Sequence, residues 1–283
     1  MVTVSSRRDE HNARVREQFR LQASTFTDTG FAANNLDWIL AELAPQPGEQ
    51  ALDVACGAGH LGRALAGHLA HVEALDLTPE MLAQGDRLAR EAGLSNISFS
   101  LGEATALPWL DAQFDLVVCR ITLHQVADPA AVVREMVRVT RPGGRIGITD
   151  IVLDHPGNTP DNDAHVGDGF GSEVDAAVVE RNTRLERLRD PSHGRTLLTR
   201  EIQQMLVDAG AGGVSTNARG VVLDLEDWMT RSQTPEQDRT VIRGALDEEL
   251  AGGPLTGLRP GQEGDTRTLT HLWATILARR PTP

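Results

Sequence analysis

Two carboxylates and two glycines are spaced in a way that can hold a small charged ligand. Gly57 and Gly59 follow a short apolar stretch, and glycine lets a turn take positive φ and lets a ligand lie against bare backbone. Asp53 lies within the apolar stretch, where a carboxylate suits an ammonium group. Asp76 ends the next apolar stretch, where a carboxylate in a doubly wound fold meets ribose hydroxyls. The pattern predicts a nucleoside ligand, although a plain strand-to-helix turn would also use the two glycines.

Two kinds of nucleoside fit these residues. Gly62 extends the glycines to a G-x-G-x-x-G string, which is typical of dinucleotide-binding oxidoreductases. S-adenosylmethionine also fits, because its ammonium group suits Asp53, its ribose suits Asp76 and its carboxylate suits the amides that open the next helix. Its adenine needs only apolar side chains. One ligand then explains both carboxylates, and NAD remains the alternative.

Missing residue types exclude several enzyme classes. The chain has no lysine and no tyrosine. Phosphate-loop NTPases, protein kinases and pyridoxal phosphate enzymes each depend on a lysine. Short-chain dehydrogenases use a tyrosine together with a lysine, so that class of nicotinamide enzyme is excluded as well.

Charge and composition narrow the partners. A net charge of −13 and a pI near 5.1 argue against nucleic acid and anionic membranes, which attract basic surfaces. We therefore expect a small-molecule partner, and the oligomeric state stays open. The chain has two cysteines, no paired-ligand spacing for a metal and no run of about 18 apolar residues. These features predict a cytoplasmic protein with reduced thiols and no metal site.

Alternating strands and helices position the two carboxylates. Apolar stretches predict strands, and turn residues and helical spacing separate them with helices. The expected strands are 50–55, 72–77, 97–101, 114–119, 145–150, 213–221 and 268–278, and the expected helices are 9–22, 36–43, 61–69, 79–92, 129–139, 172–188 and 199–209, the last with Thr199 as its N-cap. Segments 224–230 and 235–250 complete the chain.

This order predicts an α/β fold with a doubly wound, mostly parallel seven-stranded sheet. We divide the chain into an N-terminal helix and flap (1–32), a core that binds the cofactor (33–152), an inserted helical lid that shapes the acceptor site (153–198) and a C-terminal completion of the sheet (199–283).

Several motifs resemble those of class I S-adenosylmethionine-dependent methyltransferases, in particular the ubiquinone/menaquinone-biosynthesis (type 11) group. The matching segments are LDVACGAG at 52–59, ALDLTPEML at 74–82, GEA at 102–104 with LP at 107–108, FDLVV at 114–118 and RVTRPGG at 138–144. The resemblance covers residues 33–152 and extends weakly to 189–193. It implies a Rossmann-like fold and S-adenosylmethionine as the cofactor.

The resemblance also implies roles for individual residues. Asp53, Ala55, Gly57 and Gly59 would hold the methionine part, and Asp76 would hold the ribose. The adenine would contact Leu77, Met81, Glu103 and Ala104. The sequence departs from the group at two positions, since many relatives have Asp at the position of Glu103 and members of one branch have a second histidine at the position of Gln125.

Methyl transfer depends mainly on alignment of the reacting atoms, and a base is needed only when the acceptor must lose a proton. His124, just after the fourth strand, is the candidate base, although a histidine that caps or packs the following helix fits as well. Arg120 is expected to line the same edge and to contact the cofactor, although a solvated arginine is an equal alternative. His165, Asp168, His193 and Arg195 are candidates for the lid, although polar loop residues are commonly just solvated.

Trp109 and Trp228 are candidate aromatic faces for the acceptor, although both could simply fill the core. We predict a methyltransferase that acts on a small natural-product-like or quinone-like acceptor. The alternatives are the same fold reused for non-methyl chemistry such as cyclisation, and an NAD-dependent oxidoreductase.

Overall fold

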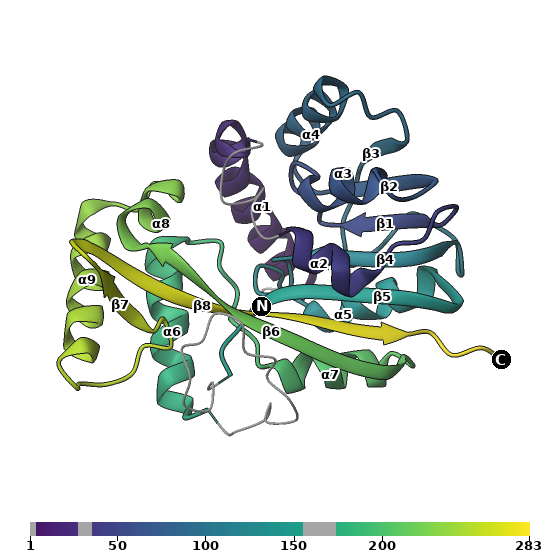
Figure 1. The fold of residues 1–283 in the computed structure, drawn as a ribbon. Helices are drawn as coiled ribbons and strands as arrows, with labels where there is room; N and C mark the ends of the chain where they lie inside the picture. Colours follow the sequence, from purple (N-terminus) through teal and green to yellow (C-terminus); the bar gives the residue numbers. More distant parts are fainter. Residues whose placement is uncertain (1–3, 28–35, 155–173) are drawn as a thin grey trace.

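A computed structural model describes residues 4–27, 36–154 and 174–283 of the chain (Figure 1). Its helices are α1 (Val4–Gln22), α2 (Leu36–Leu43), α3 (His60–Ala66), α4 (Pro79–Glu91), α5 (Pro129–Val139), α6 (Ala176–Arg189), α7 (Thr199–Asp208), α8 (Leu225–Arg231) and α9 (Glu236–Leu250), with a short 3₁₀ turn η1 (Ala23–Thr25). The strands are β1 (Gln50–Val54), β2 (His71–Asp76), β3 (Ile97–Leu101), β4 (Phe114–Arg120), β5 (Thr140–Val152), β6 (Gly212–Asp224), β7 (Pro260–Glu263) and β8 (Thr266–Arg279).

The strands form one sheet in the order β3-β2-β1-β4-β5-β8-β6. The first five strands are parallel, and β8 runs antiparallel to both β5 and β6. The strand order reverses between β1 and β4, so a crevice forms outside their carboxyl ends, where doubly wound sheets bind ligands. Asp53 lies beside Ala74 of β2 and Val118 of β4, so its carboxylate is carried next to this switch point.

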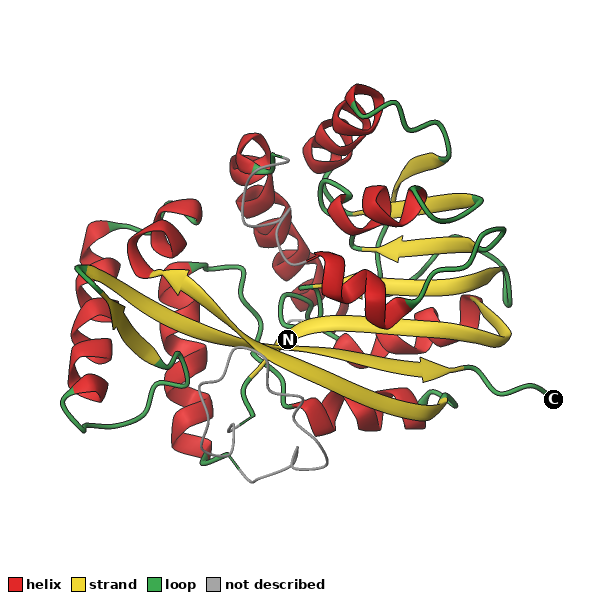
Figure 2. Cartoon of the chain, viewed as in Figure 1, coloured by secondary structure: helices red, strands yellow, loops and turns green. Residues whose placement is uncertain are grey.

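Helices cover both faces of the sheet (Figure 2). On one face α2 and α3 bury Ile39, Leu43, Leu61 and Leu65 against β1 and β4. On the other face α5 and α7 bury an apolar stripe that includes Met136 and Ile202. Because β1 and β4 are covered on both sides, most of their residues are buried and apolar, as expected for parallel strands in the middle of a sheet.

A second, smaller core lies beyond the sheet, on the long outer ends of β6 and β8 (Figure 1, left). Its members are buried apolar residues of α6, α8, α9, β6 and β8, among them Leu185, Trp228, Ile242 and Trp273. We call α6, α8, α9 and β7, with these strand ends, the outer lobe. The lobe forms one wall of the cavity described below.

The predicted doubly wound, mostly parallel sheet is confirmed, and most element ends differ from the prediction by a few residues. The described residues contain an eighth strand, β7, which pairs with β8 and was not predicted, because its sequence contains Pro260 and Gly261. Strand β5 begins earlier and ends later than predicted. Helix α7 begins at Thr199, so its N-cap is Leu198, and the Thr199 hydroxyl donates instead to Asp154 Oδ2 at 2.6 Å.

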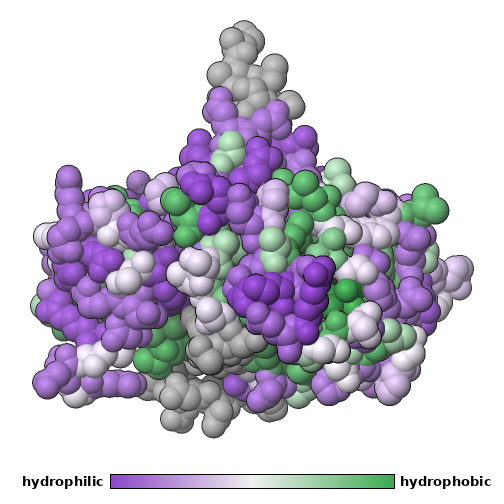
Figure 3. All heavy atoms as spheres, turned by 90° about the horizontal axis from the view of Figure 1, so that it is seen from above, coloured by the Kyte–Doolittle hydropathy of each residue, from purple (hydrophilic) through white to green (hydrophobic). Residues whose placement is uncertain are grey.

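The surface is polar, as the composition suggests. Seen from above, it is mostly hydrophilic, with apolar side chains in small separate areas (Figure 3). None of the helices in the described part of the chain is both long and apolar enough to span a membrane.

Candidate active site

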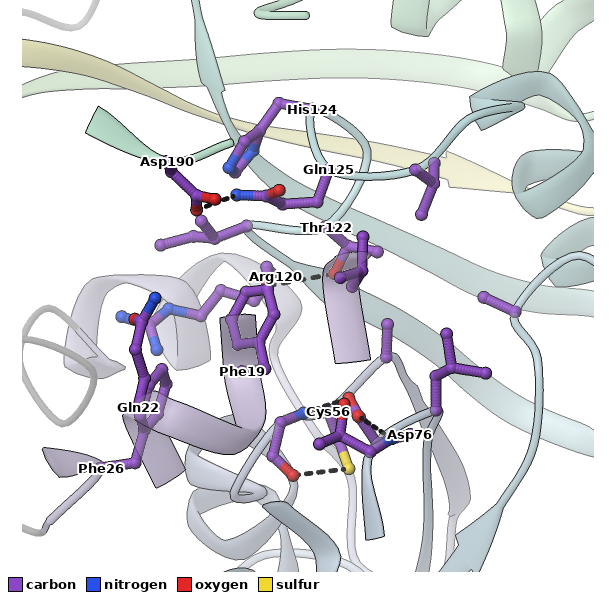
Figure 4. Close-up of a pocket in the computed structure, with 18 of the residues that line it drawn as sticks. Phe19, Gln22, Phe26, Cys56, Asp76, Arg120, Thr122, His124, Gln125 and Asp190 are labelled. Atoms are coloured by element: carbon purple, nitrogen blue, oxygen red, sulfur yellow. Dashed lines mark hydrogen bonds between the residues drawn. The ribbon is translucent and has the colours of Figure 1, made fainter. Parts of the chain in front are cut away.

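A cavity of about 220 Å³ lies at the carboxyl ends of β1, β2, β4 and β5. Strand ends supply Asp53, Asp76, Arg120 and Ile151 to its lining. In Figure 4, Cys56 and Asp76 lie at one end and His124 and Asp190 at the other. Its sides are closed by α1 and by the outer lobe. We call the end near Asp76 the cofactor end and the end near Asp190 the inner end.

The loop after β1 has the backbone conformation that the glycines predicted. Ala55, Gly57 and Gly59 have φ values of 54°, 55° and 67°, in the left-handed region that glycine adopts without strain. A Cβ on Gly57 would meet nothing within 4 Å, so one face of this loop is open. Gly59 does not line the cavity; it packs so closely that a Cβ would lie 2.7 Å from the Phe99 ring.

Asp53 is buried and lines the cavity. Its Oδ2 accepts a hydrogen bond from the Gly62 amide at 2.8 Å. A Cβ at Gly62 would lie 3.0 Å from the same oxygen, so the third glycine of the G-x-G-x-x-G string makes room for Asp53. Burial raises the pKa of Asp53 to about 7, although the Gly62 amide and Arg120 act to lower it. Such a carboxylate is poised to ionise when a cation binds.

Asp76 ends β2 and is held by backbone amides. It accepts hydrogen bonds from Gly57 N and Thr78 N, both at 2.8 Å. Burial raises its pKa, and these amides limit the rise. Leu77 also lines the cavity, whereas Met81 is fully buried between Ala58 and Ala23 and lies outside the lining. A contact between Met81 and an adenine ring stays a prediction.

Glu103 and Ala104 line the cavity on the far side of Asp76. Helix α1 crosses the cavity here and binds the Glu103 carboxylate: Asn12 Nδ2 donates to Oε1 at 2.7 Å, and Arg8 Nε lies 3.4 Å from the same oxygen. The helix also reaches the outer lobe, since Gln18 Nε2 donates to the Ser232 carbonyl at 3.1 Å. Helix α1 therefore covers the cavity through polar contacts at both of its sides.

Arg120 lies between the two ends of the cavity (Figure 4). Its guanidinium lies over the Trp273 ring, 5.3 Å from the ring centroid. Burial lowers the pKa of Arg120 to about 10, and the Asp53 carboxylate opposes this change. The next residue, Ile121, has a φ of 54°, a left-handed conformation that is strained for a β-branched side chain, by roughly 1–3 kcal/mol. The strained turn directs the chain from β4 into the loop that carries His124.

His124 forms a buried pair with Asp150, the residue near the end of β5. Its Nδ1 lies 2.5 Å from Asp150 Oδ1, and the other carboxylate oxygen accepts hydrogen bonds from the amides of Thr122 and Leu123 at 3.1 and 2.6 Å. Burial alone would lower the pKa of His124, but Asp150, with Glu186 and Asp190 farther away, more than offsets it and raises the pKa. This arrangement leaves Nε2 as the atom that can exchange a proton.

A second imidazole packs against His124. The His193 ring centroid lies 5.3 Å from that of His124, with the rings tilted by 34°. Burial lowers the pKa of His193 to about 4, so it stays neutral beside its neighbour. The amides of Gly194 and Arg195 both donate to the His124 carbonyl, at 2.9 and 3.1 Å. A histidine from this distant segment therefore lies next to His124, while Gln125 donates to Asp190 Oδ2 at 3.2 Å.

The structure separates the remaining candidates. Trp228 lines the inner end of the cavity, whereas Trp109 packs edge-on against Phe114 at 5.6 Å in the main core. Arg195 is bound to Glu201 at 2.8 Å and does not line the cavity. His165 and Asp168 lie outside the described residues. Sequence reasoning missed several lining residues from α1 and the ends of α6 and α8, which are Asn12, Phe19, Gln22, Arg189, Asp190 and Arg231.

Within the described ranges, no three His, Cys, Asp or Glu side chains come together as a metal site. The sheet order, the open loop after β1 and the carboxylates at the ends of β1 and β2 define an α/β enzyme of the class I methyltransferase type.

Comparison with known proteins agrees with this class. Residues 45–210 match the family model described as "Methyltransferase domain". The chain is 29% identical over 192 residues to the uncharacterized methyltransferase YcgJ of Bacillus subtilis, a match that covers 68% of each chain. The crystal structure of YcgJ superposes with a TM-score of 0.72 at 24% identity, covering 88% of this chain and 98% of YcgJ.

A demethylmenaquinone methyltransferase of Halalkalibacterium halodurans is 40% identical over 105 residues, which cover 36% of this chain and 42% of that relative. The chain therefore spans less than half of the menaquinone enzyme that it matches. The family match covers more than half of the chain, and the chain belongs to this methyltransferase family and, with it, to the S-adenosylmethionine-dependent methyltransferases.

Proposed function

We propose that this protein transfers the methyl group of S-adenosylmethionine to a small-molecule acceptor held at the inner end of the cavity. The observation that carries the proposal is the juxtaposition in one cavity of the loop at 55–59, flanked by Asp53 and Asp76, with the His124–Asp150 pair. When bound, S-adenosylmethionine supplies an electrophilic methyl group, whose carbon bonds to the acceptor as its bond to sulfur breaks.

The residues at the cofactor end fit that ligand. Asp53 is a buried carboxylate beside an open backbone face, which suits an ammonium group, and Asp76 offers a carboxylate held in place by two amides, which suits a ribose diol. Leu77 and Ala104 offer apolar contacts to the adenine ring of the cofactor, and Glu103 offers a carboxylate to its amino group. Arg120 lies within the electrostatic reach of Asp53 and would bind the carboxylate of the methionine part.

His124 would act as the base for an acceptor that must lose a proton. Asp150 holds the Nδ1 proton and fixes the ring, so Nε2 is free to accept the proton from a hydroxyl or an acidic carbon. The Asp150 carboxylate stabilises the imidazolium that forms. The Asp150 carboxylate is itself fixed by two amides, so the pair has little freedom to move.

The cover of the cavity would exclude water and hold the acceptor in line. Helix α1 closes one side, and the outer lobe closes the other with Trp228, Arg189 and Arg231. The division of the chain into flap (1–32), core (33–152), lid (153–198) and C-terminal completion (199–283) is part of this proposal. We also propose a cytoplasmic location. Thiols stay reduced there, and Cys56 and Cys119 are both free.

The test uses a cofactor with an isotopically labelled methyl group. The protein is incubated with this cofactor and a small-molecule extract, and products are followed by mass spectrometry. We expect a product that carries the label and gains one CH₂, with one S-adenosylhomocysteine formed per product. His124→Gln should slow this reaction, and His68→Gln, an exposed histidine outside the cavity, should not. A product of unchanged mass with intact cofactor would contradict methyl transfer and point to reuse of the fold.

A further inference from the structure

The inner end of the cavity carries more positive than negative charge. The charged residues that line it beside Trp228 are Arg189 and Arg231, with the carboxylate of Asp190 next to Arg189. Apolar walls surround them, formed by Ile121, Ile151 and Leu223. An anionic group of the acceptor would interact favourably with these guanidinium groups, whereas a wholly apolar acceptor would not.

Arg189 and Arg231 are brought together beside Trp228. Arg189 ends α6 and stacks on the Trp228 ring, 5.1 Å from its centroid, and its Nε donates to the Trp228 carbonyl at 3.3 Å. Arg231 ends α8, three residues beyond Trp228. Burial, together with the positive charge of Arg189, lowers the pKa of Arg231 to about 10. The two guanidinium groups therefore repel each other across the same part of the cavity.

Within residues 4–27, 36–154 and 174–283, the carboxylates near Arg189 and Arg231 are either engaged by other groups or exposed to solvent. Asp190 Oδ2 lies 4.0 Å from Arg189, and the Asp190 carboxylate already accepts hydrogen bonds from Ser192 N, Ser192 Oγ and Gln125 Nε2. Asp227 lies 3.0 Å from Arg231, but its side chain is 63% exposed and its charge is screened by solvent. Glu186 faces His271, with 3.3 Å between Oε1 and Nε2.

Trp228 adds a buried hydrogen-bond donor to the same wall. Its side chain is only 1% exposed and lines the cavity, and none of the described residues accepts a hydrogen bond from its indole Nε1. A buried donor without a partner is rare in native proteins and costs about 1–3 kcal/mol. A ligand oxygen at this wall would satisfy it.

We propose that the inner end binds an anionic oxygen group of the acceptor, with a carboxylate as the simplest case, through Arg189, Arg231 and the indole N–H of Trp228. The acceptor is then an apolar molecule with an anionic end, and the atom that receives the methyl group lies toward His124. This inference rests on the proposed function, because it names the class of acceptor for the same cavity.

The experiment compares acids with their neutral amides. Benzoate and 2-naphthoate, and benzamide and 2-naphthamide, are titrated into the full-length protein saturated with S-adenosylhomocysteine, and binding is followed by calorimetry. We expect at least one acid to bind about tenfold more tightly than its amide, since hydrogen bonds to a charged group are the stronger ones. Arg189→Gln and Arg231→Gln should each remove most of this preference. Arg90→Gln, an exposed arginine on α4, is the matched control and should keep it.

A second measurement locates the ligand. The protein has four tryptophans, so its indole N–H groups give a small set of NMR signals, and Trp228→Phe assigns one of them. The favoured acid should shift the Trp228 signal. Equal affinity of both acids and their amides, or an acid preference that survives in both arginine variants, would overturn the inference. Failure of S-adenosylhomocysteine itself to bind would instead contradict the proposed function, so the two failures are distinguishable.

Discussion

His124 Nδ1 lies 2.5 Å from Asp150 Oδ1, and this pair joins the loop after β4 to the end of β5. Both side chains are buried, with exposed fractions of 4% for His124 and 1% for Asp150. Asp150 therefore decides which nitrogen of His124 carries the proton and where the ring points.

The first prediction concerns Asp150→Asn. An amide can hold the ring but can also donate to Nδ1, which would place the imidazole proton on Nε2 and remove the base. We expect the turnover of an acceptor that must lose a proton to fall by about 10²-fold or more, as in His124→Gln. The affinity for S-adenosylhomocysteine should stay within about twofold. An unchanged turnover in both variants would show that no base at this position is used.

The pH dependence follows from the same pair. Because the pKa of His124 is raised above 6.5, its base form is present only above that raised value. Turnover should rise with pH through a pKa above about 6.5, and in Asp150→Asn the residual turnover should rise at lower pH. The stabilising contribution of protonated His124 has the opposite sign: it is fully present below the pKa of the unfolded chain and is lost as pH rises through the folded value. Thermal unfolding of wild type and Asp150→Asn at several pH values measures it.

Asp53 predicts a pH dependence of cofactor binding. With a pKa of about 7, Asp53 is largely neutral at about pH 6 and ionised at about pH 8, and only the ionised form attracts an ammonium group. The affinity for S-adenosylhomocysteine should therefore rise severalfold over this range, with uptake of the ligand releasing a proton. Asp53→Asn should bind more weakly and with a flat pH profile. Calorimetry in two buffers of different ionisation enthalpy counts the protons released on binding. An affinity that rises with pH as steeply in Asp53→Asn as in the wild type would contradict this role.

The close backbone contact between Gly194 and His124 leads us to expect that the 190–195 segment holds His124 in place. A Cβ at Gly194 would lie 2.8 Å from the His124 carbonyl oxygen, and a backbone atom cannot move aside easily. Gly194→Ala should lower the free energy of unfolding by about 1–3 kcal/mol and slow turnover by displacing His124. The control is Gly244→Ala in α9, where a Cβ would meet nothing within 4 Å and which should be neutral or slightly stabilising.

From the contacts that helix α1 makes over the cavity, we expect it to act as a cover that opens when the cofactor is exchanged. Asn12→Ala removes one tether to Glu103, and Glu103→Ala removes the tether and the expected contact with adenine. Both variants should increase amide hydrogen exchange in α1. Only Glu103→Ala should weaken S-adenosylhomocysteine binding by more than about threefold, the loss of one hydrogen bond. Equal affinities in the two variants would assign Glu103 to the cover alone.

Much of the fold was predictable because the central strands β1, β2 and β4 are mostly buried, and their sequences are therefore largely apolar. Asp53 and Asp76 were predictable for the same reason, since a carboxylate in or at the end of such a strand has few structural uses. The G-x-G-x-x-G string, by contrast, did not distinguish two ligands, because Gly62 is explained equally well by its contact with Asp53.

The rest depends on contacts between segments that are far apart in sequence. Asp150 lies near the end of β5 and His124 lies in the loop after the neighbouring strand β4, while His193 comes from beyond α6. No local pattern therefore indicates either pairing. Helix α1 is polar and gives no sign that Asn12 binds Glu103. Strand β7 forms only because β8 offers it an edge, although its own sequence is typical of a turn.

Calorimetric titration with S-adenosylhomocysteine tests the central claim most directly, using the wild type, Asp76→Ala and the control Asp86→Ala, a half-exposed carboxylate on α4. We expect one site per chain, a loss of about tenfold or more in affinity for Asp76→Ala, as for removal of a charged hydrogen-bond partner, and no change for Asp86→Ala. NAD should not bind. No binding of S-adenosylhomocysteine to the wild type, or equal affinity in Asp76→Ala, would contradict the proposed cofactor site.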